Sequence, residues 1–207
     1  MSAINIPDSA RYFMFIRMCI VFCVLTIGAA GLQAETVTDH AGRQVDVPDN
    51  PGRVVSLAPS ITEIVFAVNR GDRLVGVTEY SNYPQDAREI PSVGSYVYLD
   101  LEKIFSLKPD LCIAIKDGNP IGVIRRLQEL DIPVFAVNPR DMESVMTSLS
   151  DIGALLGAQE KADEVVADMK SRINRVRQKV NEVSHRPGVF FQIGVSPIVS
   201  AGTDTFI

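Results

Sequence analysis

The stretch RVVSLAPSITEIVFAV (53–68) contains a strand and a helix in direct succession, and this pair decides the class of fold. Its first part, RVVSLA (53–58), is an apolar run of the kind found in parallel strands that are covered on both faces. In its second part, apolar residues recur at helical spacing at Ile61, Ile64, Val65 and Val68. We expect Ser60 and Glu63 to form a capping box at the start of this helix.

The same alternation of strand and helix continues along the chain. Three further apolar runs are expected to be strands: LVGV (74–77), LCIAI (111–115) and PVFAV (133–137). Asn119 followed by Pro120 is expected to open another helix, with Asn as the N-cap and Pro in the first turn. Ahead of these units, ETVTDHAGRQVDVP (35–48) alternates apolar and polar residues around Gly42, which predicts a hairpin. This pattern predicts an α/β fold, with a three-layer lobe around a parallel sheet.

A long helix is expected after the α/β region, because no Gly or Pro occurs from Ala158 to Val183. One apolar stripe runs along it at Ala162, Val165, Val166, Met169, Ile173, Val176 and Val180. Acidic residues lie early and basic residues lie late, which suits the helix macrodipole. Such a helix would be roughly 40 Å long, enough to cross one lobe and reach a second. The same pattern of apolar and charged residues would also suit an ordinary surface helix with a solvated charged face.

The first 34 residues are expected to be a secretory signal peptide. Arg11 and Arg17 precede the apolar stretch MCIVFCVLTIGAAG (18–31), and LQA ends at Ala34, after which we expect cleavage. A retained membrane anchor is the alternative.

A second lobe is expected to begin near the other end of the chain. HRPG (185–188) is expected to end the long helix, and VFFQIG (189–194) is expected to be a buried strand. The predicted organisation is a signal peptide (1–34), an N-terminal α/β ligand-binding lobe (35–157), a long backbone helix (158–184) and the start of a truncated C-terminal lobe (185–207).

Charge and composition argue against several function classes. The 207 residues carry a net charge of −5 without a long basic run, so a nucleic acid is not an expected partner. Once the signal is removed, Cys112 is the one cysteine left, so the mature chain cannot form an internal disulfide. An exported protein without disulfides fits a bacterial periplasm. We expect Cys112 to be a small buried hydrophobic residue. His40 and His185 are scattered and do not suggest a metal site. No GxSxG, P-loop or strand-linked GxGxxG motif points to an enzyme.

Several of these segments, in this order, resemble the substrate-binding proteins of ABC importers for vitamin B12 and ferric siderophores, the helical-backbone metal receptors. The segments are RVVSLAPSITEIVFAV (53–68), GDRLVGVTEYSNYP (71–84), LEKIFSLKPDLCIA (101–114) and VFFQIGVSPIVSAGTDTFI (189–207). The resemblance covers essentially all of residues 35–207. It implies two α/β lobes joined by one long rigid helix, with the ligand in the cleft between them. It also implies a periplasmic monomer that delivers its ligand to an inner-membrane ABC permease with its ATPase.

Within this class, YSNYP (80–84) followed by VGSYVYLDLEKI (93–104) is most similar to the receptors for vitamin B12. The resemblance implies that Tyr80 lies against the corrin ring of cobalamin. It also implies that Tyr96 takes the place of an aromatic residue, usually Trp, in the same cleft. Ile115 falls where those receptors have another aromatic residue, and this departure weakens the assignment of the exact ligand.

The expected topology agrees with the implied site. Loops at the carboxyl ends of parallel strands converge on the crevice of an α/β sheet, where Tyr80 and Ser60 both follow strands. Ser60 therefore joins Tyr80, Tyr96 and Ile115 as an expected ligand-binding residue. Tyrosine suits a broad, partly apolar ligand, because its ring covers area and its hydroxyl forms hydrogen bonds at the rim. Glu102 matches the family's docking glutamate, which the resemblance implies pairs with arginines of the permease.

Other interpretations stay open. Tyr80 and Tyr83 could be ordinary half-buried loop tyrosines, and Glu102 could simply be an acid in the first turn of a helix capped by Asp100. The ligand could be a ferric siderophore or haem instead of cobalamin, and each of these brings its own metal. The chain could also be a truncated inactive product or an exported α/β enzyme. With the second lobe unfinished, we expect this chain alone to bind weakly.

Overall fold

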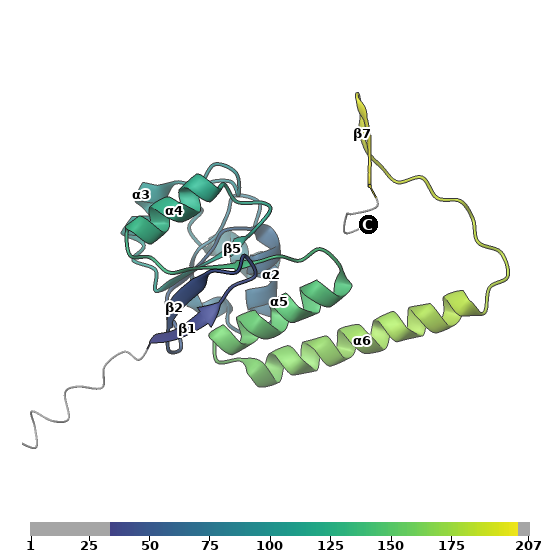
Figure 1. Cartoon of the computed structure of the whole chain (residues 1–207), viewed down its shortest axis with the longest axis horizontal. Coiled ribbons are helices and arrows are strands. Elements are labelled where there is room, and N and C mark those ends of the chain that lie inside the picture. The colour runs from purple at the N-terminus through teal and green to yellow at the C-terminus, as the bar shows by residue number, and fades with distance from the viewer. Residues whose placement is uncertain (1–33, 203–207) are drawn as a thin grey trace, which may run out of the picture. The chain divides into compact units, whose positions relative to one another are not determined.

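The computed structural model describes residues 34–202, so the predicted signal peptide up to Gln33 lies outside the described residues (Figure 1). An antiparallel hairpin comes first, and a parallel sheet follows with the strand order β4-β3-β5-β6. The strands are β1 (Ala34–Thr38), β2 (Gln44–Pro48), β3 (Val54–Ser56), β4 (Leu74–Gly76), β5 (Leu111–Ile115) and β6 (Val134–Val137). The predicted hairpin and the four predicted apolar strands are confirmed. No helix within residues 34–202 is long and apolar enough to span a bilayer.

Alternate residues of each central strand face two separate halves of the hydrophobic core. On β5, Leu111 and Ile113 belong to one half, whereas Cys112 and Ala114 belong to the other. Two helices contribute to each half: α2 (Pro59–Ala67) and α5 (Met142–Leu155) to the first, α3 (Leu101–Ser106) and α4 (Ile121–Glu129) to the second (Figure 1). Two short 3₁₀ helices, η1 (Gly71–Arg73) and η2 (Gln85–Glu89), flank β4. These layers form the predicted three-layer α/β lobe.

The tip of the β1–β2 hairpin covers the outer edge of β6. The amide of His40 donates to the carbonyl of Ala136 over 2.9 Å, and the amide of Ala136 lies 3.3 Å from a carboxylate oxygen of Asp39. Arg43 Nη2 donates to the carbonyl of Val134 over 3.2 Å. These bonds replace a further strand, so the backbone groups of β6 are not left open for pairing with another chain.

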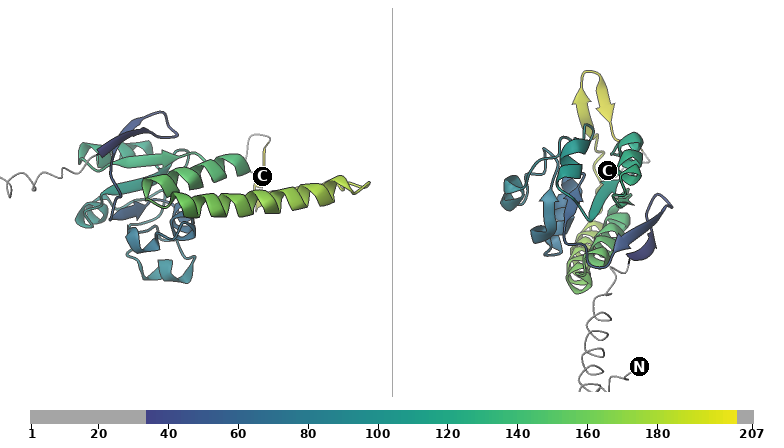
Figure 2. Two further views of the ribbon diagram at one scale, coloured as in Figure 1. Left: turned by 90° about the horizontal axis from the view of Figure 1, so that it is seen from below. Right: turned by 90° about the vertical axis from the view of Figure 1, so that its left-hand side faces the viewer.

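The predicted long helix is present as α6 (Gln159–Asn181), which lies beside α5 in both views (Figures 1 and 2). The contact is close at Gly153, where an added Cβ would lie 2.4 Å from the Cβ of Ala162. Val165, Val166 and Met169 also pack at this contact, but Val176 is 61% exposed. The predicted apolar stripe is therefore covered only in the first half of the helix.

Two predicted helix caps are wrong. The α2 helix starts at Pro59 with Ala58 as N-cap and no side-chain cap bond, so the capping box of Ser60 and Glu63 does not form. Pro59 has a fixed φ that suits the first helical position, which moves the helix start ahead of Ser60. The N-cap of α4 is Pro120 rather than Asn119.

The last described elements form a separate antiparallel pair, β7 (Gln192–Val195) and β8 (Ile198–Ser200). The prediction that VFFQIG (189–194) is a buried strand is wrong for the structure described, because Val189 and Phe190 are 82% and 70% exposed. This two-stranded sheet has no strand neighbour within residues 34–202, so its apolar side chains face solvent.

Candidate functional site

The carboxyl ends of β4, β3, β5 and β6 meet at one edge of the sheet, because all four strands are parallel. Ser60 follows β3 as the second residue of α2, and Ile115 is the last residue of β5. Tyr80 lies in the loop that leaves β4. The topology thus places these three predicted ligand-binding residues at the edge where ligands of open α/β sheets bind.

Buried hydroxyl groups hold the loop that carries Tyr80. The hydroxyl of Ser81 lies 2.9 Å from the hydroxyls of both Thr62 and Thr78. Thr62 in turn lies 2.8 Å from the hydroxyl of Ser56 at the end of β3. The backbone of the loop is therefore fixed, while the side chain of Tyr80 is 61% exposed.

Asn119 joins three parts of the edge, and its role was missed in the sequence. Its Nδ2 donates to the carbonyls of Leu57 and Tyr96, each over 2.8 Å. Its Oδ1 accepts from the amide of Ile115 over 2.8 Å. A carboxamide has two donors and one acceptor oxygen, so one buried side chain can meet all three backbone groups. The sequence signal is an Asn in the loop between β5 and α4, beside Pro120, and this position predicts a helix cap instead.

The side chains of Tyr96 and Ile115 both come close to Gly118. A Cβ added at Gly118 would lie 3.3 Å from Ile115 Cγ2 and 3.9 Å from Tyr96 Cδ2. Tyr96 is 43% exposed, and Ile115 is partly buried against the core. An aromatic ring and an aliphatic side chain therefore form one apolar surface at the end of β5.

A charged pair lies beside this surface. Arg140 Nη2 donates to Asp117 Oδ2 over 3.1 Å, and both side chains are more than half exposed. Asp117 directly precedes Gly118, and Arg140 follows β6 by three residues.

The amide and the hydroxyl of Ser144 hydrogen-bond to Asp141 and lower the pKa of its carboxyl group, which keeps the cap of α5 ionised.

Glu102 is exposed in the first turn of α3, next to the N-cap Asp100, whose carboxylate accepts from the amide of Lys103 over 2.9 Å. The cap predicted for Asp100 is confirmed. The backbone amide of Asp100 donates to Val93, which ties the start of α3 to the loop that carries Tyr96. The docking role of Glu102 stays a prediction.

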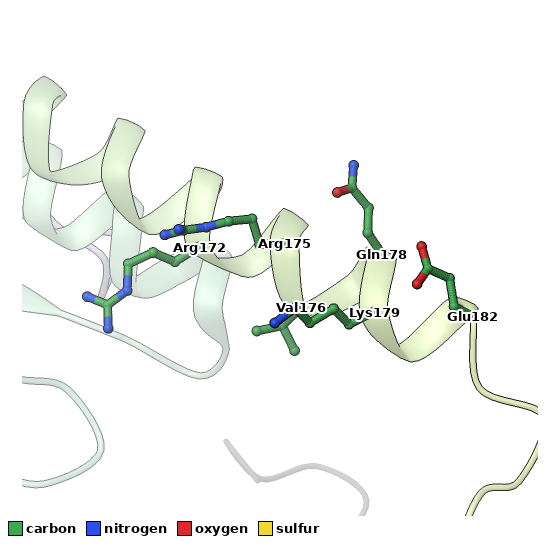
Figure 3. A pocket seen from close by; sticks show the side chains of 6 residues that line it. All are labelled: Arg172, Arg175, Val176, Gln178, Lys179 and Glu182. Atoms are coloured by element: carbon green, nitrogen blue, oxygen red, sulfur yellow. The ribbon is translucent and has the colours of Figure 1, made fainter.

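A hollow of about 490 Å³ lies along the end of α6 (Figure 3). Its lining side chains are Arg172, Arg175, Val176, Gln178, Lys179 and Glu182. Five of these residues belong to α6 and Glu182 is its C-cap, so one segment supplies the whole lining, whereas a ligand pocket needs concave walls. We therefore assign no ligand to it.

The titratable groups that coordinate metals are dispersed. Within residues 34–202, no three His, Cys, Asp or Glu side chains are grouped so that they could hold a metal ion. His40 Nε2 lies 2.7 Å from Asp151 Oδ2, and its Nδ1 accepts from the amide of Asn138. Cys112 is buried as expected, and desolvation raises the pKa of its thiol to about 12.

Comparison with known proteins points to one family. Residues 54–207 match the family model described as periplasmic binding protein. The chain is 34% identical over 178 residues to an uncharacterized ABC transporter substrate-binding lipoprotein of Bacillus subtilis, a match that covers 83% of this chain and 56% of that protein. The chain therefore spans about half the length of the curated relatives it matches.

Two solved structures share the fold. The vitamin B12-binding protein of Vibrio cholerae aligns with a TM-score of 0.67 and 31% identity, over 76% of this chain and 62% of that one. A periplasmic heme-binding protein of Pseudomonas aeruginosa aligns with a TM-score of 0.69 and 29% identity, over 75% of this chain and 58% of that one.

Proposed function

Since the chain belongs to the periplasmic binding protein family, we propose that it is the ligand-binding component of an ABC importer and that its ligand is cobalamin. The observation that carries the proposal is that two exposed tyrosines stand on loops whose backbone is held by hydrogen bonds, at the carboxyl edge of the sheet. Tyr80 and Tyr96 are 61% and 43% exposed, although hydrogen bonds pin the backbone around each of them. Rigid loops with exposed rings favour binding, because little conformational entropy is lost when a ligand covers them.

The chemistry of this edge suits a broad ligand with an apolar face. Tyr80, Tyr96 and Ile115 offer two rings and one aliphatic side chain, which can pack against a corrin macrocycle. Ser60 is exposed at the start of α2, where its hydroxyl can meet a polar group of the ligand. In this proposal the sheet edge is one wall of the cleft, residues 185–207 begin the opposite lobe, and α6 connects the two.

Delivery of the ligand requires contact with a membrane permease. Glu102 is our candidate for this contact, because an exposed acid at the start of a short helix can pair with an arginine of the partner. One exposed pair of this kind adds little affinity, but it can orient the two proteins and speed their encounter. In this proposal the protein acts in the periplasm, after export directed by residues 1–34.

A haem or ferric-siderophore receptor is the second candidate. The similarity to a heme-binding protein of Pseudomonas aeruginosa favours it. A flat porphyrin could also lie on Tyr80 and Tyr96, and its iron would arrive with the ligand.

Binding of cyanocobalamin, haemin and a ferric hydroxamate to the protein exported by its native host tests the proposal. We expect stoichiometric binding of unchanged cyanocobalamin, tighter than that of the other two ligands. Tyr80→Ala and Tyr96→Ala should each weaken this binding by about tenfold, whereas Tyr98→Ala on the same loop should not. Preferential binding of haemin would support the second candidate, and turnover of any ligand would contradict both.

A further inference from the structure

The ion pair between Asp117 and Arg140 is held at the carboxyl edge by the backbone on both sides. The amide of Lys116, next to Asp117, donates to the carbonyl of Val137 over 2.8 Å, which fixes the exit of β5 against the exit of β6. The amide of Arg140 donates to the hydroxyl of Ser144 over 2.8 Å, within the cap of α5. The two charged groups therefore start from fixed backbone positions and project into solvent at the same place.

Stability of the lobe does not explain this pair. The side chains of Arg140 and Asp117 are 60% and 52% exposed, and such exposed ion pairs contribute little to the stability of a fold. A similar pair occurs on the outer surface of α4, where Arg126 lies 2.8 Å from Glu129. What distinguishes Asp117 and Arg140 is their position beside the surface formed by Tyr96 and Ile115.

The pair presents a donor and an acceptor side by side with no net charge. Arg140 uses Nη2 for the contact and keeps further N–H groups, and Asp117 keeps Oδ1. A primary carboxamide is complementary to this arrangement, because its oxygen can accept from Arg140 while its nitrogen donates to Asp117. A carboxylate could accept from Arg140 but would be repelled by Asp117.

We infer that Asp117 and Arg140 select ligands whose edge carries neutral amides over ligands whose edge carries carboxylates. The inference rests on the proposed function, since it concerns the rim of the same site. A macrocycle lying on Tyr96 and Ile115 would extend its peripheral groups towards Asp117, the residue next to Gly118. The pair thus acts on the edge of the ligand, whereas the apolar residues act on its face.

The test compares cyanocobalamin with its monocarboxylic acid derivatives, in which one peripheral propionamide is hydrolysed. We expect the wild-type protein to bind at least one of these acids about three- to fivefold more weakly than the amide, the size of effect that exposed charges produce. Asp117→Asn should bring that ratio close to one, because the repulsion is removed. Arg140→Gln should increase the ratio, because Asp117 is then unpaired. Glu129→Gln, which breaks the matched pair on α4, should leave the ratio unchanged.

The outcomes separate this inference from the proposed function. If the wild-type protein binds cyanocobalamin but neither Asp117→Asn nor Arg140→Gln changes the ratio, the role of the pair is overturned and the cobalamin proposal stands. Equal binding of cyanocobalamin and its monocarboxylic acids by the wild-type protein would likewise overturn the role of the pair and leave the cobalamin proposal standing. If haemin, a dicarboxylate, binds stoichiometrically and cyanocobalamin does not, both the ligand and the selection for amides are wrong.

Discussion

Asn119 Nδ2 donates a hydrogen bond of 2.8 Å to the backbone carbonyl of Tyr96, across 23 residues of chain. The same nitrogen reaches Leu57 at the end of β3, and the side-chain oxygen accepts from Ile115 at the end of β5. Asn119 is 7% exposed, so water cannot readily replace these bonds. The backbone of Tyr96 is therefore held by a buried side-chain amide.

Replacement of Asn119 by Ala should destabilise the protein and weaken its ligand binding. The carbonyls of Leu57 and Tyr96 would lose their donor, and an unsatisfied buried polar group costs about 1–3 kcal/mol. Urea denaturation should show a lower midpoint with an unchanged slope. The control is Asn82→Ala, at an exposed loop position, which should leave the midpoint within experimental error. An equal loss in both variants would contradict this role of Asn119.

The buried hydroxyl cluster predicts a second effect, on the loop that carries Tyr80. Thr62→Val keeps the shape of the side chain but removes the hydroxyl that lies close to Ser56 and Ser81. We expect a loss of about 1 kcal/mol, together with faster hydrogen exchange at the amide of Ser81. Thr147→Val is the matched control, because Thr147 is an exposed helical threonine bonded only to its own helix. Unchanged exchange at Ser81 in Thr62→Val would show that the cluster does not hold the loop.

Asp39 predicts a pH dependence of stability. Burial alone would raise the pKa of its carboxyl group, but hydrogen bonds from Arg43, the charge of Arg43 and the amide of Ala136 together lower it below 3.8. A carboxyl group with a lowered folded-state pKa adds stability above its unfolded pKa, and this stability is lost as the pH falls through the folded-state pKa. Above about pH 5, the free energy of unfolding of the wild-type protein should therefore exceed that of the Asp39→Asn variant by a constant amount.

The difference between the wild-type protein and Asp39→Asn should shrink below about pH 4, as urea melts over a series of pH values would show. Asp49→Asn, at an exposed position before β3, serves as the control and should follow the wild-type curve. A difference between wild type and Asp39→Asn that stays constant down to pH 2 would contradict the lowered pKa.

The strands of the lobe could be predicted because their signal is local. LCIAI (111–115) coincides with β5, since four of its five residues are buried on both faces of the sheet and leave an uninterrupted apolar run. The α6 helix was equally clear from its lack of Gly and Pro. The two wrong caps have different causes. Pro59 takes the first position of α2, ahead of Ser60, whereas the side chain of Asn119 bonds to Ile115, Leu57 and Tyr96 and Pro120 becomes the N-cap of α4.

The connections between distant loops could not be predicted. Asn119 and Leu57 are 62 residues apart, and nothing near Asn119 in the sequence indicates that partner. The exposure of Phe190 was also missed, because an apolar segment is expected to be buried whether or not another surface is present to cover it. Tyr80 and Tyr96 came from a family resemblance, and their contact with a ligand stays a prediction.

The contact between α5 and α6 predicts a steric effect at Gly153. An added Cβ would lie 2.4 Å from the Cβ of Ala162, and neither backbone can move easily, so Gly153→Ala should destabilise the protein by about 1–3 kcal/mol. Gly122→Ala in α4 is the control, because nothing lies within 4 Å of its added Cβ, and it should be neutral or stabilising. Adding Ala162→Gly to Gly153→Ala should recover part of the loss, with a coupling of at least about 0.5 kcal/mol in a double-mutant cycle. Strictly additive effects would mean that the two helices are not in contact at this point.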